Sequence, residues 1–374
     1  MDFDFTQEQR QLADAVRRWI AKDYGFEARR HIVRSEQGVS APAWEAMVEL
    51  GLTALPVPEA QGGFDGSAVD MLAVMQELGR GMVVEPYFAT AWGAEFLKLA
   101  GGQAALLEQV ASGQLTLACA LGERQSRYDL FDIAATARAD GDGFVLDGAK
   151  VVVLHGAQAG CLIVSARGAG GQREREGISL FVVAADAPGV TRRDYRTIDG
   201  QRAADIQFVN VRVPASALLG RAGQGWDILD AAADYGAALL CAEAVGAMEA
   251  LNEATLEYLK TRQQFGVPIG KFQVLQHRMA DMAMELELAR SLAVLAADRV
   301  SSSDPIERRR AVSAAKARVG QAQRFIGQQA VQLHGGMGVT DELPAAHWFK
   351  RLAMIEATLG DTDYHLARFA GEGA

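Results

Sequence analysis

The chain has 374 residues, of which 49% are hydrophobic and 22% are charged, and its formal net charge is -10. This composition is ordinary for a globular protein and allows two or three domains with large cores. The acidic balance argues against nucleic acid as the main partner, because phosphate binding requires an excess of Lys and Arg. No stretch approaches the length of uncharged apolar residues that a membrane span needs, and the N-terminus lacks the parts of a signal peptide, so we expect a cytoplasmic protein.

The first part of the chain has a helical pattern. Thr6 precedes Gln9 by three residues and an amphipathic stretch follows, which is typical of a capping box at the start of a helix. Helical spacing continues to about residue 110, with breaks near residues 38–43 and 56–66. We therefore predict a helical domain over residues 1–113.

A small β domain is predicted to follow. From Leu115 the hydrophobic period changes from about 3.6 to 2, and short β-rich stretches alternate with clusters of Gly and Asp. The last of these strands runs over 205–213 and ends at Pro214. We predict that this domain covers residues 114–222.

From Trp226 the pattern is helical again, with one helix expected at about 306–333. An apolar helical stretch at 238–260 precedes Arg262, and a buried stripe at steps of three and four follows it. The stripe consists of Leu275, Met279, Met282, Leu286 and Ala289. These segments predict a hairpin of two long helices with Arg262 at the corner, in a domain over residues 223–374.

Three cysteines, Cys119, Cys161 and Cys241, stand singly in apolar surroundings. They have no CxxC spacing, so the sequence indicates neither a disulfide framework nor a metal site. We expect buried free thiols and no bound metal.

The corner itself reads Arg262-Gln263-Gln264-Phe265-Gly266. An Arg fork pairs with phosphate oxygens and a Gly lets the backbone approach a ligand closely, so this segment can bind a phosphate. An ordinary helical turn with an exposed Arg is the alternative. Some seventy residues later, Gln332-Leu333-His334-Gly335-Gly336-Met337-Gly338 ends another long helical pattern with a glycine cluster.

In this order and at this distance, the two segments resemble the flavin-binding segments of the acyl-CoA dehydrogenase family. The resemblance covers nearly the whole chain, including Asn210-Val211-Arg212-Val213-Pro214 and the helix start at Phe5-Thr6-Gln7-Glu8-Gln9. It implies that family's α+β fold. In that fold a middle β-barrel or β-sandwich domain lies between an N-terminal helical domain and a C-terminal four-helix bundle that forms the tetramer core.

The resemblance also implies an activity. The family oxidises an acyl-CoA thioester at its α and β carbons: a Glu carboxylate takes the α proton, FAD takes the β hydride, and electrons leave through an electron-transfer flavoprotein. In the family the two segments reach across a subunit interface to the adenosine and pyrophosphate of a neighbour's flavin. The matching cofactor-binding residues here are Arg262, Phe265, Gly266, Gln273, Gln332, Gly335 and Gly336.

The residues that would form this chain's own half of the flavin site differ from the family's pattern. Where the family has a Thr-Glu-Pro segment with Gly-Ser-Asp, this chain has the different sequence 121–129. Where the family has Trp-Ile-Thr against the flavin ring, this chain has Val152-Val153-Leu154. A Val has therefore replaced an aromatic plane, and Leu154 has replaced a hydroxyl donor.

The position of the catalytic base differs as well. Aligned without gaps, the family's Tyr-Glu-Gly-Thr falls on Thr358-Leu359-Gly360-Asp361, so Leu359 stands in place of the Glu. Glu356, one helical turn earlier, is one candidate for the base. Glu243 is the other, because some members use the helix before Arg262, at about Gly236 here, and Glu243 lies on the same helix face. For each, an ion-paired or surface carboxylate is the alternative.

The chain thus matches the family in the half of the flavin site that it donates to a neighbour, but not in its own half or at the catalytic base. This combination matches the small subunit of heterotetrameric acyl-CoA dehydrogenases. Such subunits pair with a homologous, flavin-bearing large subunit that oxidises long, cyclic or dicarboxylic CoA thioesters, sterol side chains among them. We interpret the chain as a subunit of this kind, in fatty acid or steroid catabolism. Two alternatives remain: a self-sufficient homotetramer that uses Glu356 or Glu243, and a non-catalytic assembly protein with the same fold.

Overall fold

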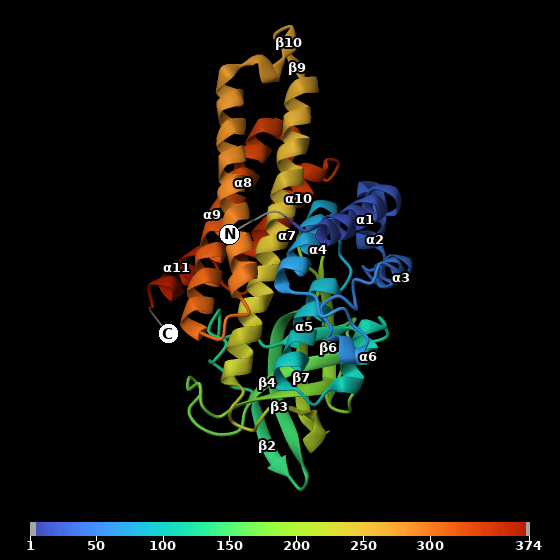
Figure 1. The fold of residues 1–374 in the computed structure, drawn as a ribbon, viewed down its shortest axis with the longest axis vertical. Helices are drawn as coiled ribbons and strands as arrows, with labels where there is room; N and C mark the ends of the chain where they lie inside the picture. Colours follow the sequence, from blue (N-terminus) through green and yellow to red (C-terminus); the bar gives the residue numbers. More distant parts are fainter. Residues whose placement is uncertain (1–4, 372–374) are drawn as a thin grey trace. The chain divides into compact units, whose positions relative to one another are not determined.

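The computed structural model describes residues 5–371, and its order of helices, strands and helices is the predicted one (Figure 1). The helices before the sheet are α1 (Gln7–Asp23), α2 (Phe26–Arg34), α3 (Ala41–Glu49), the 3-10 turn η1 (Glu59–Gln61), α4 (Ala68–Gly81), α5 (Tyr87–Ala100) and α6 (Ala104–Ala111). The predicted capping box is confirmed: the Thr6 hydroxyl accepts from Gln9 N at 3.2 Å, and the Gln9 side chain accepts from Thr6 N at 2.9 Å.

The strands follow. They are β1 (Leu117–Ala120), β2 (Thr136–Asp140), β3 (Gly143–Leu154), β4 (Cys161–Arg167), β5 (Ile178–Ala184), β6 (Val190–Arg196), β7 (Arg202–Pro214) and, after the 3-10 turn η2 (Ala215–Ala217), β8 (Leu218–Leu219). The predicted last strand at 205–213 is confirmed, although β7 begins three residues earlier.

The C-terminal elements are again helical. They are α7 (Trp226–Thr261), the short strands β9 (Gln263–Gln264) and β10 (Val267–Pro268), η3 (Ile269–Lys271), α8 (Gln273–Arg299), α9 (Pro305–His334), η4 (Gly335–Val339), α10 (Pro344–Ala357) and α11 (Thr362–Ala370). The helix predicted at about 306–333 is confirmed as α9. No helix within residues 5–371 combines the length and the apolar character that crossing a bilayer requires.

By backbone contacts the chain forms two compact units. The first comprises the chain up to His31, Ala68–Val83, and the chain from Ala237 onward; the second comprises Ile32–Ser67 and Val84–Gly236. Each unit draws on segments that are distant in sequence.

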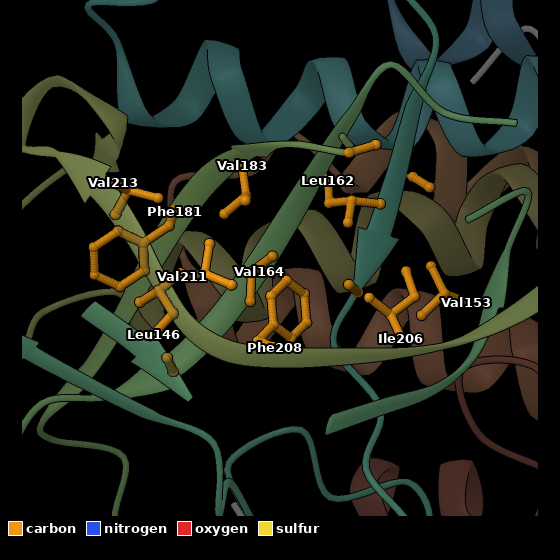
Figure 2. Close-up of a cluster of buried hydrophobic side chains, with 14 of the residues drawn as sticks. Leu146, Val153, Leu162, Val164, Phe181, Val183, Ile206, Phe208, Val211 and Val213 are labelled. Carbon is orange, nitrogen blue, oxygen red and sulfur yellow. The ribbon is translucent and has the colours of Figure 1, made fainter. Parts of the chain in front are cut away.

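The second unit is built on a mixed sheet with the strand order β6-β7-β3-β2-β4-β5-β8, and β1 pairs in parallel with β4. Alternate side chains of these strands form one apolar core, with Phe181 and Phe208 among its largest members (Figure 2). Successive strand residues face opposite sides of the sheet, which explains the hydrophobic period of two in the sequence. Of the cysteines, Cys119 and Cys241 are buried, whereas Cys161 is half-buried, and all three are free thiols.

A buried ion pair lies beneath the segment 121–129. The Lys150 ammonium is fully buried and donates to Glu123 Oε1 at 2.7 Å, to Ser165 Oγ at 3.0 Å and to the Leu121 carbonyl at 3.2 Å. Burial by itself raises the pKa of Glu123, but the Lys150 charge and several hydrogen bonds lower it overall. The pair therefore stays ionised and anchors this segment to β3 and β4.

The first unit depends on a close crossing of α4 and α7. A Cβ atom at Gly79 would lie 2.0 Å from the Glu243 carbonyl oxygen, and one at Gly246 would lie 1.8 Å from the Gln76 carbonyl oxygen. Only glycine leaves room for this backbone contact. Beyond the crossing, α7 and α8 run side by side to the β9–β10 turn (Figure 1), and Asn252 Nδ2 of α7 donates to the Met282 carbonyl of α8 at 3.3 Å.

Gly246→Ala tests the crossing. In an open helix this change stabilises a protein slightly, but here the methyl group would overlap a carbonyl oxygen, so we expect a loss of about 1–3 kcal/mol in the free energy of unfolding. Gly25→Ala is the control, because nothing lies within 4 Å of its Cβ position. Chemical denaturation monitored by circular dichroism measures both; equal stability of the two variants would refute the close contact.

Lys150→Met tests the buried pair. Removal of the cation leaves the Glu123 carboxylate buried without its charge partner, so we expect the free energy of unfolding at pH 7 to fall by about 3–5 kcal/mol. The double variant with Glu123→Gln removes both charges and should recover much of this loss. A double variant no more stable than the single one would contradict the ion-pair account.

The same pair predicts a pH dependence. Burial lowers the pKa of Lys150 from 10.5 to about 8. Between these values the unfolded chain binds more protons than the folded chain, so this group makes the protein more stable as the pH rises from about 8 to 10.5. Lys150→Met should lack this contribution, so denaturation curves across that pH range should show a difference from wild type that widens as the pH rises.

Candidate functional site

The corner between α7 and α8 is a two-residue β-hairpin. Gln264 pairs with Val267, and the two residues between them have positive φ, +55° at Phe265 and +78° at Gly266. Positive φ at both central residues is the geometry of a type I′ turn, which Gly adopts freely and a bulky L-residue does not. Phe265 is therefore held in a strained conformation, and its side chain is 90% exposed. Strain together with an exposed aromatic ring is a feature of binding segments.

Arg262 stands at the base of this hairpin. Its N–H donates to the Tyr258 carbonyl at 2.9 Å, and its carbonyl accepts from Ile269 N at 2.8 Å, so its backbone is fixed on both sides. Its side chain is exposed, and within residues 5–371 no acidic group pairs with it. Gln273, the first residue of α8, is exposed as well.

The second predicted segment forms the end of α9. Gln332 lies in its last turn, and Gly335 closes the helix with φ +61° and an N–H that donates to the Gln332 carbonyl. Among residues 5–371, nothing would lie within 4 Å of a Cβ atom at Gly335 or at Gly336. Packing within the chain thus does not explain Gly336, and the backbone here is open to a ligand or to another chain.

The structure brings the two segments together through a contact that the sequence did not reveal. Tyr258, one helical turn before Arg262, places its ring 4.5 Å from the ring of His334, and its hydroxyl donates to the His334 carbonyl at 3.3 Å. Burial lowers the pKa of His334, whose Nδ1 lies 2.8 Å from the Ala330 carbonyl. In the sequence, the one sign of this contact is that Tyr258 and His334 lie next to the two motifs.

Glu243, a candidate base, belongs to a buried ion pair. Its two carboxylate oxygens accept from Arg351 Nε at 2.6 Å and Nη2 at 2.8 Å, and both side chains are 5% exposed. This bidentate geometry joins α7 to α10 and engages both carboxylate oxygens. The geometry favours the structural alternative for Glu243.

Glu356, the other candidate, is also engaged. Its Oε1 accepts from Thr362 N at 3.0 Å and from Thr362 Oγ1 at 2.7 Å, while Oε2 accepts from Gln323 Nε2 at 3.0 Å. The carboxylate thereby satisfies a free N–H at the start of α11, the usual role of a helix cap. Its side chain remains 13% exposed, so one edge of it borders a pocket.

Leu359, at the position of the family's Glu, offers no acid or base. It has φ +57°, a strained value for a Leu, and its carbonyl accepts from His365 Nε2 at 2.9 Å. Lys316 donates to the carbonyls of Ile355, Glu356 and Gly360 at 2.8–3.3 Å. Burial lowers the pKa of His365 to about 3, so His365 stays neutral and the loop is fixed by hydrogen bonds.

In the second unit, Val152 lies at an irregularity in the pairing of β3 with β7, between Lys150 and Val153. Its φ of +53° is unusual for a β-branched residue, and its side chain is 52% exposed. Val152 N donates to Asp205 Oδ1 at 3.3 Å. The backbone is therefore strained at Val152, and the Val152 side chain is exposed. Neither Val152 nor Leu154 offers an aromatic plane or a hydroxyl group.

Comparison with known proteins identifies the family. Residues 6–113, 118–211 and 223–372 match the family models "Acyl-CoA dehydrogenase, N-terminal domain", "middle domain" and "C-terminal domain" respectively. The probable acyl-CoA dehydrogenase YngJ of Bacillus subtilis (strain 168) is 30% identical over 372 residues, which is 97% of each chain.

Two solved structures are similar over nearly their whole length. One is the ChsE4-ChsE5 complex from Mycobacterium tuberculosis, with a TM-score of 0.89, 25% identity, and coverage of 100% of this chain and 98% of that one. The other is the steroid ACAD Tcur3481-Tcur3483, with a TM-score of 0.89, 28% identity, and coverage of 98% and 97%. The chain belongs to the acyl-CoA dehydrogenase family.

Proposed function

We propose that this chain is the small subunit of a heterotetrameric acyl-CoA dehydrogenase and contributes Arg262 and its neighbours to a flavin held mainly by a homologous large subunit. The main support for the proposal is the exposure and strain of the β9–β10 hairpin. Arg262 is exposed and lacks an acidic partner within residues 5–371, beside a strained Phe265 that is 90% exposed. A chain that did not use this surface would have no need to keep such strain.

The residues of the first unit fit part of FAD. The planar guanidinium of Arg262 suits a pyrophosphate, the ring of Phe265 suits an adenine face, and the open backbone at Gly335 and Gly336 permits close approach. Gln273 and Gln332 add exposed amide groups for polar contacts. When bound, FAD supplies the acceptor for the substrate's β hydride.

The second unit does not fit the flavin ring in the family's manner. Val152 and Leu154 have no group that could stack on the ring or donate to it, and Glu123 is committed to Lys150. The chain's own half of a flavin site is therefore incomplete. This difference between the halves favours a heteromer over a self-sufficient homotetramer.

The carboxylates support the same conclusion. A general base has to approach the α proton within hydrogen-bonding distance, with a pKa suited to accept it. Glu243 pairs with Arg351, Glu356 accepts two hydrogen bonds from Thr362 at the start of α11, and Leu359 carries no acid or base. We infer that the proton is taken by a Glu of the large subunit, in that subunit's own active site.

The solved relatives make a partner chain and a sterol-type substrate reasonable. Both are described by paired names, ChsE4-ChsE5 and Tcur3481-Tcur3483, and the second is called a steroid ACAD. We propose a CoA thioester of a long or cyclic acyl group as substrate, with an electron-transfer flavoprotein as the acceptor of the electrons.

Purification of the chain alone tests the heteromer. We expect less than one FAD per chain by visible absorbance, because the ring contacts are missing, and no bleaching when acyl-CoA thioesters are added. Co-expression with a homologous large subunit should yield a yellow complex. Stoichiometric FAD in the isolated chain, with substrate-driven bleaching, would instead establish the homotetramer.

Arg262→Ala tests whether this chain contacts a flavin that is held mainly by the large subunit. The change removes a charge-assisted contact worth roughly 1.5–3 kcal/mol, so we expect flavin affinity in the co-purified complex to fall about tenfold to a hundredfold. Lys260→Ala is the matched control, since Lys260 is an exposed cation two residues away that pairs with Glu257 at 2.7 Å. FAD retention after gel filtration measures the effect, with circular dichroism to verify folding. Equal retention by both variants would rule out the donated contact.

A further inference from the structure

One face of α8 is exposed along about four helical turns and is largely apolar. This outer face consists of Val274, His277, Asp281, Met284 and Leu288, which recur at steps of three and four and therefore lie in one row along the helix. Val274 is 61% exposed, Met284 58% and Leu288 53%. Large apolar side chains exposed in a continuous row are typical of a surface that binds another protein chain.

Asp281 is the middle residue of the outer face and the acid on it. Other acids of α8 are paired within the chain, since Glu285 lies 2.6 Å from Arg318 Nη2 and Glu287 lies 3.4 Å from Arg290 Nε. Asp281 is exposed and forms no ion pair among residues 5–371. A solvated carboxylate of this kind becomes costly once another chain covers it, unless that chain brings a cation.

The outer face begins beside the residues that we propose to contact a neighbour's flavin. Gln273 is the first residue of α8, and Phe272, directly before it, is 38% exposed. The Phe272 ring lies 6.1 Å from the ring of Phe265 in the hairpin. A chain that holds the flavin contacted by Arg262 and Gln273 therefore has to lie against this end of α8. On the proposed function, that chain is the large subunit.

Two copies of this chain are poorly suited to meet along the outer face. In a two-fold symmetric pair the same surface meets itself, so antiparallel α8 helices that overlap along this row place its middle residue close to the symmetry axis. Both Asp281 carboxylates would then be covered near one another among apolar side chains. Like charges in that setting repel each other and have no compensating cation. Asp281 thus disfavours a homomer on this face.

We propose that the outer face of α8 binds the equivalent helix of the homologous large subunit, and that a Lys or Arg of that helix pairs with Asp281. The apolar residues supply the buried area, and the charge pair decides which chain binds. This inference rests on the proposed heteromer and goes further by naming the surface and the residue that select the partner. It does not depend on the flavin contact of Arg262, so either can fail while the other holds.

Charge exchange within this chain tests the face without the large subunit. Asp281→Lys presents a cation at the middle of the same face and stands in for the partner. Fluorescently labelled wild type is titrated with each unlabelled chain, and sedimentation velocity gives the dissociation constants. We expect Asp281→Lys to bind labelled wild type about tenfold more tightly than unlabelled wild type does, because a desolvated charge pair replaces two like charges.

Asp363→Lys is the matched control. Asp363 is an exposed acid of α11 that likewise forms no ion pair among residues 5–371, and it lies outside the outer face. Its replacement should leave the dissociation constant unchanged. No gain in affinity with Asp281→Lys, or an equal gain with Asp363→Lys, overturns the proposal.

A second substitution in the Asp281→Lys chain tests the apolar contact. Leu288→Gln removes an apolar side chain from the outer face and should lower the affinity for wild type about fivefold. Leu256→Gln, which changes a side chain of α7 that is 41% exposed and off the face, should have no effect. Circular dichroism verifies the fold of both. An affinity that Leu288→Gln leaves unchanged refutes the outer face as the site of contact.

The co-purified complex tests the identity of the partner. In this chain Asp281→Lys places two cations against each other, so its yield with a tagged large subunit should fall about fivefold relative to Asp363→Lys. The FAD content of each complex that still forms should equal that of wild type. Loss of the flavin contact, as in Arg262→Ala, lowers FAD per complex without changing the ratio of the two chains. Equal yields of the two Lys variants overturn the assignment of this face to the large subunit.

Discussion

Tyr258 and His334 join the two segments on which the functional interpretation rests. Their rings lie 4.5 Å apart, and a hydrogen bond from the Tyr258 hydroxyl reaches the carbonyl next to Gly335. The contact links the last turn of α7 to the last residue of α9, some seventy residues later in the chain. The hairpin with Arg262 and the glycine turn are thus linked by contacts within the chain.

Buried charges in this protein hold the backbone in place. Glu243 and Arg351 join α7 to α10, Lys316 binds three carbonyls around Leu359, and Glu123 with Lys150 anchors the segment 121–129. Each group is satisfied by partners within the chain, as burial of a charge requires. A carboxylate in such a network is poorly placed to take a proton from a substrate. The same interactions that stabilise the fold therefore occupy Glu243 and Glu356, the two candidates for the base.

Three residues at positions that the family resemblance singles out have a strained backbone. Phe265, Val152 and Leu359 all have positive φ, although none is a Gly, an Asn or an Asp. Each lies at a position where the resemblance implies a contact with the flavin or the substrate. At Val152 and Leu359 the side chain differs from the family's pattern, and hydrogen bonds on either side hold the unusual backbone. At Phe265 the side chain matches the family's pattern, in line with the contact proposed above.

The sequence by itself determined the element types and their order. The change of hydrophobic period near Leu115 and the capping box at Thr6 depend on neighbours within one turn or one strand, so they can be read locally. The family segments at Arg262 and Gln332 were recognisable for the same reason. Tertiary structure alone decided the partners of Glu243 and Glu356, because Arg351 and Gln323 approach them from other helices. It also decided the pocket between α9 and α10, since no pattern in the sequence shows that Gly320 and Gly327 bring two helix faces together around an empty volume.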